Sequence, residues 1–398
     1  MMLWIGALVF GTVLGLLGLS WVLDLCDFVA AAYTRLFQLL AVPTIAVAVI
    51  CTLSTLGSDK GTGKIFLKTI TYTLLTTLAA SLVGLLLYLV VRPDNLPSAL
   101  LGNTVADSSL TPETSVYGHI LNTIPNNIIR PILEGNVLSI LIIAAAVGMA
   151  LSKMQDSDSK GVLLKGLQGL QDLLFMLIKW LIATLPIGIV AFAAQLSSQF
   201  GSGLIAESLG KYVLVIIGGN LIQMIVVLPL FLLARGLNPL KVMKAMMPAV
   251  LMALFTKSSA ATLPVTISSA EDRLGAKQKV SRFVLPICTT INMNGCAAFI
   301  LVTSLFVMQN GGMVPSLSAG TMVTFFLSWV LISVVSAVGN AGVPMGCYFL
   351  TLSLMTGVGA PVAVMGLILP IYTIIDMIET AENVWSDSCV CAMVDASS

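Results

Sequence analysis

The sequence predicts an all-α, polytopic membrane protein. Hydrophobic residues make up 58% of the 398 residues and charged residues only 9%, whereas a soluble globular domain carries about 25% charged residues. Several apolar runs are long enough to span a bilayer, which takes about 20 residues. The last apolar stretch nevertheless contains several acidic residues, and such residues are rare in spanning helices unless they serve a pathway or a site. These observations together favour a transporter.

Six apolar runs precede residue 240, at 3–23, 36–56, 66–91, 135–152, 173–197 and 212–234. Alternate connections carry most of the basic residues: Lys60, Lys64, Lys68, Lys153, Lys160, Lys165, Arg235, Lys241, Lys244, Arg273, Lys277, Lys279 and Arg282. Of the other connections, those at 92–134 and 198–211 hold only Arg92, Arg130 and Lys211. Because basic loops stay in the cytoplasm, we expect a cytoplasmic N-terminus, an external loop over 93–130 and a multi-pass protein of the plasma membrane, the inner membrane in a bacterium.

The second half contains interrupted apolar segments. One, at 245–270, is broken at 256–264 and has basic residues on both flanks, so both of its ends are expected in the cytoplasm. Another, at 320–358, is broken at 339–346, and a Gly- and Asn-containing stretch at 289–296 lies between them. Irregular backbone at membrane depth is tolerated only where it is buried or lines a cavity. We therefore predict two re-entrant hairpins around an unwound stretch, a pattern that marks transporter sites.

The final apolar segment carries one polar stripe. At about 100° per residue, one face collects Tyr372, Asp376, Glu379, Thr380, Asn383 and Asp387, while Glu382 lies outside it. A carboxylate at the centre of a spanning helix costs about 2.5–3.5 kcal/mol on insertion scales. The stripe is therefore expected to face water, an ion or a solute. No basic run for nucleic acid is present, and the seven cysteines show no zinc spacing, so we expect free thiols.

These segments carry a family resemblance. Lys257-Ser-Ser-Ala-Ala-Thr-Leu-Pro264 resembles the first hairpin tip of the sodium-coupled glutamate, neutral amino acid and dicarboxylate transporters. Asn292-Met-Asn294-Gly295 is similar to their Asn-Met-Asp-Gly motif, and Ala341-Gly-Val-Pro344 to their second hairpin tip. The spacing of the polar residues in the final segment also matches. The resemblance covers nearly the whole chain and implies the glutamate-transporter-like fold, with eight transmembrane helices and two re-entrant helical hairpins.

The resemblance also implies an organisation and a mode of action. Scaffold helices 1 and 2 would occupy 1–65, and transport-domain helix 3 would occupy 66–92. The external loop and scaffold helices 4 and 5 would occupy 93–211, and the rest of the transport domain 212–398. The family assembles as a homotrimer in lipid, and its transport domain slides as an elevator.

No enzyme is expected, because an intramembrane protease needs acids on facing helices and here they share one helix.

The matching residues receive roles from the resemblance. Asp376 would hold a substrate ammonium, Thr380 and Asn383 would donate to its carboxylate, and backbone near Ser258, Ser259 and Gly342 would add helix-terminus dipoles. One sodium site would use Asn292, Asn383 and Asp387, and a second would use carbonyls near Met293 and 336–340. A third would use Thr76 and Thr77 with Asn294, where the family has an aspartate. The missing charge predicts weaker binding of that ion.

Glu379 is the most informative departure from the family. Carriers of acidic substrates have an arginine there, whereas a glutamate repels a second carboxylate by about 4 kcal/mol at about 4 Å and an effective dielectric constant of about 20. The family's serine/threonine carriers look similar here. We therefore predict sodium symport of serine, threonine or alanine. Three alternatives remain: Glu379 as a structural partner of Lys257, proton- or sodium-coupled uptake of glutamate, aspartate or a dicarboxylate, and an anion channel.

Overall fold

A computed structural model describes residues 2–55, 63–96, 125–134, 137–198, 204–314, 319–338 and 345–397. Within these ranges the regular structure is helical, with no strand, which confirms the predicted all-α class. Four described helical stretches are long and apolar enough to cross a membrane: Lys64–Val91, Leu209–Ala234, Pro239–Thr256 and Gln278–Asn310. The bent pair Ala363–Leu369 and Ile371–Ala396 gives a fifth if it is one span. The count of eight helices and two hairpins stays a prediction.

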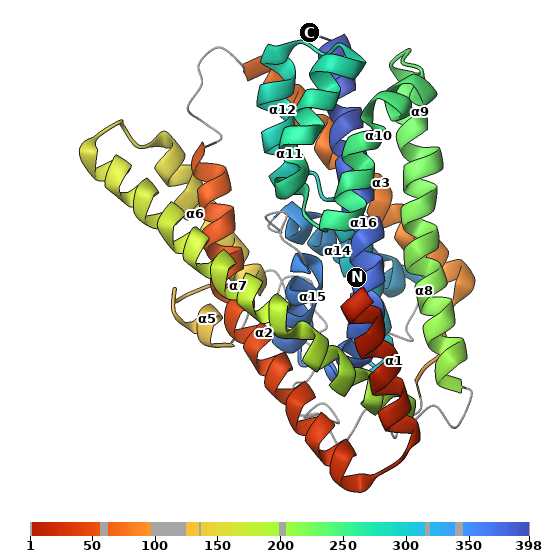
Figure 1. Cartoon of the computed structure of the whole chain (residues 1–398). Coiled ribbons are helices and arrows are strands. Elements are labelled where there is room, and N and C mark those ends of the chain that lie inside the picture. The colour runs from red at the N-terminus through yellow and green to blue at the C-terminus, as the bar shows by residue number, and fades with distance from the viewer. Residues whose placement is uncertain are drawn as a thin grey trace.

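The first helices pack mainly on one another. They are α1 (Met2–Leu16), α2 (Ser20–Thr55), α6 (Val137–Lys153) and α7 (Asp158–Ser198), with the short α5 (Arg130–Glu134) beside α6. In Figure 1 the long α2 and α7 lie side by side. The predicted span 3–23 was placed wrongly, because α1 ends at Leu16 and α2 already begins at Ser20, whereas 36–55 lies within α2. Gly18 has φ 64°, a left-handed conformation that ends a helix.

Small residues bring α1 close to α7. A Cβ on Gly11 would lie 2.4 Å from the Val190 carbonyl oxygen, and one on Gly15 would lie 2.2 Å from that of Ala194. Two glycines four residues apart expose a strip of bare backbone, as in the small-xxx-small contacts of membrane helices. The contact between α1 and α7 therefore depends on these glycines.

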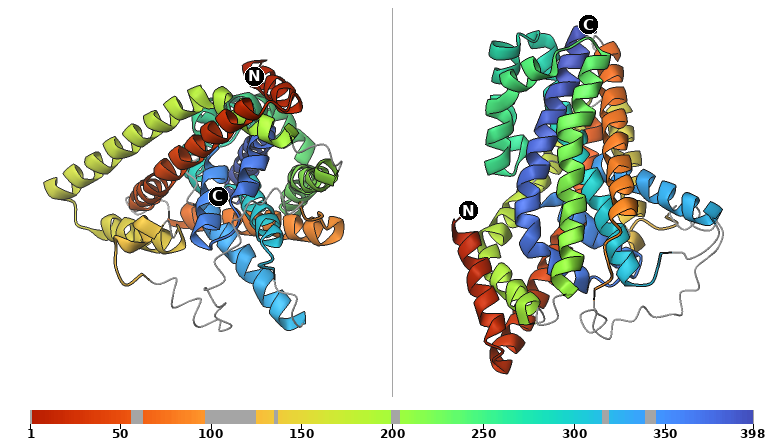
Figure 2. Two further views of the ribbon diagram at one scale, coloured as in Figure 1. Left: turned by 90° about the horizontal axis from the view of Figure 1, so that it is seen from below. Right: turned by 90° about the vertical axis from the view of Figure 1, so that its right-hand side faces the viewer.

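The other helices gather around α16 (Ala363–Ala396). They are α3 (Gly63–Val91), α8 (Leu204–Ile222), the π-helical η3 (Gln223–Val227), α9 (Leu228–Ala234), α10 (Pro239–Thr256), α11 (Ser259–Ser268), the π-helical η4 (Ser269–Leu274), α12 (Gln278–Ile291), α13 (Asn294–Asn310), α14 (Ala319–Val338) and α15 (Gly346–Gly357). The right-hand view of Figure 2 shows α3, α8 and α16 running side by side. Every residue of α16 from Ala381 to Val394 is buried by the neighbouring helices.

Two of the predicted breaks are present. Lys257 adopts φ 53° between α10 and α11, which then pack against each other as a helical hairpin. Asn292 and Met293 separate α12 from α13 with non-helical backbone. The break predicted at 339–346 falls mainly on 339–344, outside the described residues, between the end of α14 at Val338 and the start of α15 at Gly346.

Candidate functional site

The polar stripe of α16 lies inside the protein. Asp376, Glu379, Thr380, Asn383 and Asp387 are all at most 6% exposed. Buried polar and charged groups need partners, because the protein interior cannot solvate them. The surroundings of these side chains therefore show what the stripe can do.

Asp376 lies opposite the tip of the α10–α11 hairpin. The Lys257 ammonium donates to the Thr373 carbonyl oxygen at 2.7 Å and attracts the Asp376 carboxylate. Asp376 also accepts a hydrogen bond from the Met345 amide at 3.3 Å, and its main-chain oxygen accepts one from the Thr380 hydroxyl at 2.7 Å. The carboxylate thus links α16 to the hairpin tip and to the start of α15.

Ser258 and Ser259 begin α11. Ser258 is the N-cap, with extended backbone, and its hydroxyl accepts from the Ala261 amide at 3.2 Å. Capping with Ser at this position is a common way to satisfy the first free amides of a helix. Ser259 is buried. The structure therefore gives Ser258 a capping role, while contact of either serine with a substrate stays a prediction.

The residues predicted to hold sodium come together from three elements. The Asn292 amide nitrogen donates to Asp387 Oδ1 and to Ser386 Oγ, both at 2.9 Å. Thr77 donates to Asn294 Oδ1 at 2.8 Å, and Asn294 donates to Ser386 Oγ at 2.7 Å. The hydroxyl of Thr76 lies 3.2 Å from Asn292 Oδ1 and 3.4 Å from Asn294 Oδ1.

This network consists of oxygen ligands and one carboxylate, the donor set that hard cations prefer. It is fully buried between α3, the break at 292–293 and α16. The residues therefore fit a sodium ion chemically. The backbone expected to supply the second site lies partly at 339–340, outside the described residues.

Asn383 ties α16 to the beginning of α13. Its Oδ1 accepts from the Gly295 amide at 2.9 Å, and its Nδ2 donates to Cys296 Sγ at 3.5 Å. Along α16, Asn383 lies between the proposed substrate ligands Asp376 and Thr380 and the network around Asp387. Its assigned contributions to both sites are consistent with this position but stay predictions.

Glu379 lies among sulfur and aromatic groups. Its Oε2 accepts from the Tyr372 hydroxyl at 3.1 Å, whereas Oε1 is buried and makes no hydrogen bond. Tyr372 packs against Phe299, with ring centroids 4.6 Å apart. Cys296 and Cys347 form a disulfide beside Glu379. The expectation of free thiols was therefore wrong for this pair, because the fold brings two cysteines 51 positions apart into contact.

Comparison with known proteins decides the family. The chain matches the Sodium:dicarboxylate symporter family over residues 1–397. The protein belongs to this family. It is 26% identical to excitatory amino acid transporter 3 of Mus musculus over 96% of this chain and 82% of that protein. It is 28% identical to neutral amino acid transporter B(0) of Oryctolagus cuniculus over 89% of this chain and 70% of that protein.

A third relative is neutral amino acid transporter A of Homo sapiens, which is 30% identical over 74% of this chain and 54% of that protein. This membership in the sodium:dicarboxylate symporter family confirms the resemblance read from the motifs. The protein is a membrane transporter and not an enzyme, as predicted.

Several residues around the symporter's polar stripe escaped the sequence prediction. Ser386 bridges Asn292 and Asn294, yet it lies off the predicted stripe, so helical periodicity gave no signal for it. Each of Cys296 and Cys347 lies in a hydrophobic stretch and gives no sequence signal on its own. Their importance comes from the contact between them in the fold. Gly342, assigned to the substrate site, lies outside the described residues.

Glu382 has surroundings unlike those of the stripe. Both of its carboxylate oxygens are buried without a hydrogen-bond partner, as is Asn220 Oδ1. A Cβ on Gly295 would lie 2.7 Å from Asn220 Oδ1 and from Glu382 Oε2, so these two oxygens are at most twice that distance apart. The Gly295 amide bonds to Asn383 and provides only a favourable dipole to Glu382. Only glycine, which has no side chain, fits at position 295.

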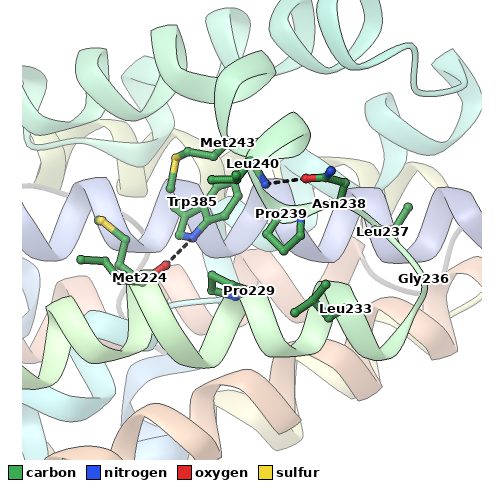
Figure 3. A pocket seen from close by; sticks show the side chains of 11 residues that line it. Met224, Pro229, Leu233, Gly236, Leu237, Asn238, Pro239, Leu240, Met243 and Trp385 are labelled. Carbon is green, nitrogen blue, oxygen red and sulfur yellow. Dashed lines mark hydrogen bonds between the residues drawn. The ribbon is translucent and has the colours of Figure 1, made fainter.

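An apolar groove on the symporter lies elsewhere. Figure 3 shows it between η3, α9, the start of α10 and Trp385, whose indole donates to the Met224 carbonyl oxygen at 3.0 Å. Asn238 caps α10 at its edge by accepting from the Leu240 and Lys241 amides. Its lining residues include none from the stripe. We therefore assign the groove no part in solute recognition.

Proposed function

We propose that this protein is a secondary active symporter that moves a small neutral amino acid, such as serine, threonine or alanine, into the cell with sodium. The observation that carries the proposal is Glu379, a buried acid three residues from Asp376 on α16, with one oxygen lacking a hydrogen-bond donor. A second carboxylate at this position would meet repulsion of about 4 kcal/mol. A hydroxyl group would instead donate to the free oxygen.

Asp376 supports recognition of an amino acid rather than a plain dicarboxylate. Its carboxylate is buried and interacts with a single described cation, Lys257. A substrate ammonium would provide a second positive charge between Asp376 and Glu379. The relatives include proteins named as neutral and as excitatory amino acid transporters, so they favour an amino acid without deciding its side chain.

Sodium coupling is supported by the family and by the network around Asp387. We propose that Asn292, Asn383 and Asp387 hold one ion, and that carbonyls near Met293 contribute to a second. Asn294 with Thr76 and Thr77 would bind a third ion weakly, because an amide replaces the charged ligand. Fewer sodium ions per turnover than in carriers of acidic substrates would follow.

We also propose the family's architecture for this chain: a homotrimer in which the parts at 66–92 and 212–398 move as an elevator. The packing supports this division, since α16 contacts α3, α8 and α10 to α13, and α1, α2, α6 and α7 contact one another. The two groups meet where α16 contacts α7 and where α15 contacts α2 and α6. The inward orientation of the N-terminus rests on the distribution of basic residues.

Ligand binding to the purified protein tests the proposed function. Serine, threonine or alanine should raise the midpoint of thermal unfolding in sodium chloride but not in choline chloride, and Asp387→Asn should abolish the effect. Stabilisation by glutamate or succinate in preference to serine would overturn the assigned substrate. Stabilisation that is equal in choline would overturn sodium coupling.

A further inference from the structure

Three helices present metal-binding atoms at one buried point. Cys296 lies in the first turn of α13, Cys347 in the first turn of α15, and Glu379 in α16. The two sulfur atoms and a Glu379 carboxylate oxygen lie within 4.8 Å of one another, and all three residues are buried. The sulfurs are joined in a disulfide, with the Cα atoms 5.4 Å apart. The sulfur pair therefore faces an acid.

The acid itself indicates a missing ligand. Tyr372 donates to one oxygen of Glu379, but the other oxygen is buried and makes no hydrogen bond. Leaving a buried charged acceptor unsatisfied is costly, because it has lost its water and gained nothing in return. A cation at this point would satisfy the free oxygen whenever no substrate hydroxyl donates to it. This observation is independent of the closeness of the two cysteines.

The ligand types restrict which cation fits. Reduction of the disulfide by a dithiol or a phosphine adds two electrons and two protons and gives two thiols. A divalent metal then displaces the thiol protons and binds two thiolates and one carboxylate. Thiolates select zinc and its softer analogues over magnesium or calcium, which take oxygen ligands. Three protein ligands leave a fourth coordination position open.

We propose that Cys296, Cys347 and Glu379 form a binding site for zinc or cadmium in the reduced protein. The disulfide and the bound metal are alternative states of the same sulfur pair. A bound ion would join α13, α15 and α16 beside Asn383, which already contacts Cys296. Metal binding does not depend on the proposed function, whereas inhibition of amino acid uptake by the metal would.

Cadmium titration of the full-length protein tests the site. The purified protein is reduced with a phosphine, freed of reductant without oxygen, and titrated with cadmium chloride while the ultraviolet thiolate-to-cadmium absorption is recorded. We expect one tightly bound ion per chain. Cys296→Ser and Cys347→Ser should each lose this absorption at one equivalent, and Glu379→Gln should keep the band but bind at least about tenfold more weakly.

Controls separate this site from other thiols and from misfolding. Cys391→Ser removes a buried free cysteine elsewhere in α16 and should leave the titration unchanged. The wild-type protein with its disulfide intact should show no band at one equivalent, and this comparison requires no mutation. No band in the reduced wild type, or a band lost in Cys391→Ser and kept in Cys296→Ser, would overturn the proposal. Absence of amino acid uptake under every condition would count against the proposed function alone.

Discussion

Glu379 and Glu382 are buried acids less than one turn apart on α16, but their neighbours differ. Glu379 belongs to the predicted polar stripe and accepts a hydrogen bond from Tyr372, another member of the stripe. Glu382 instead lies near Asn220 and Gly295, on another side of the helix. The two glutamates therefore form a matched pair, in which the same chemical change should alter different properties.

Substitution of Glu379 should change selectivity. Glu379→Gln keeps the shape of the side chain and removes the charge that opposes an acidic substrate. Aspartate should then compete against labelled serine at least about tenfold better than in the wild type, since the repulsion amounts to about 4 kcal/mol. Glu382→Gln serves as the control and should leave the aspartate-to-serine ratio unchanged. Equal changes in both variants, or no change in the first, would contradict the role of Glu379.

Gly295 should tolerate no side chain. In Gly295→Ala the new Cβ would lie 2.7 Å from two oxygen atoms and 3.0 Å from the Glu379 Cα, so α13 and α16 would have to separate. Overpacking of this kind costs about 1–3 kcal/mol. Thermal unfolding in detergent measures the loss. Gly210→Ala is the control, because a Cβ there meets nothing within 4 Å. Unfolding midpoints that match would show that the crowding is relieved without cost.

At the scale of elements, packing explains which sequence predictions succeeded. The polar stripe and the break at 292–293 followed from local sequence, because an unwound stretch needs Gly and Asn and a helix face needs regular spacing. The helix boundaries near Gly18 did not, since a hydrophobic run continues through the turn. The disulfide between Cys296 and Cys347 and the bridging position of Ser386 depend on contacts between distant helices. Spacing along one element cannot predict such contacts.

The contact between α1 and α7 provides a test at this scale. Gly15→Leu places a Cβ 2.0 Å from Ser197 Oγ and 2.2 Å from a main-chain oxygen, so the two helices must move apart. We expect loss of thermal stability that exceeds that of Gly6→Leu, where nothing lies within 4 Å of the new Cβ. If both variants unfold alike, close packing of these helices contributes little to stability.

The stability contributed by the contact between η4 and α12 should fall in acid. Arg282 donates two hydrogen bonds to Glu271, at 2.9 and 3.0 Å, and Ser281 donates a third, so the pKa of Glu271 lies below its usual value of 4.5. The stability from this contact is therefore present above the unfolded pKa and is lost as pH falls through the lower folded pKa. Unfolding of Glu271→Gln should show a small loss at pH 7 that disappears in acid. A difference from wild type that is constant with pH would contradict this account.

At the scale of the whole molecule, the helices around α16 and the group of α1, α2, α6 and α7 are expected to have different functions. The part that gathers around α16 contains every described residue of the predicted substrate and sodium sites, while α1, α2, α6 and α7 contribute none. An elevator would move the first part past the second. In an elevator, sodium must travel with the substrate, so the sodium ligands must belong to the part that moves. The predicted ligands around Asp387 all lie in the part that gathers around α16.

Solute flux under a sodium gradient tests the central claim most directly. The protein is reconstituted in liposomes, and uptake of labelled serine, threonine, alanine, glutamate, aspartate and succinate is measured with sodium outside and choline inside. We expect the three neutral amino acids to accumulate, and accumulation to vanish when choline replaces sodium at fixed pH. Preferential uptake of an acidic substrate, accumulation that persists without sodium, or ionic current without solute uptake would contradict sodium-coupled neutral amino acid symport.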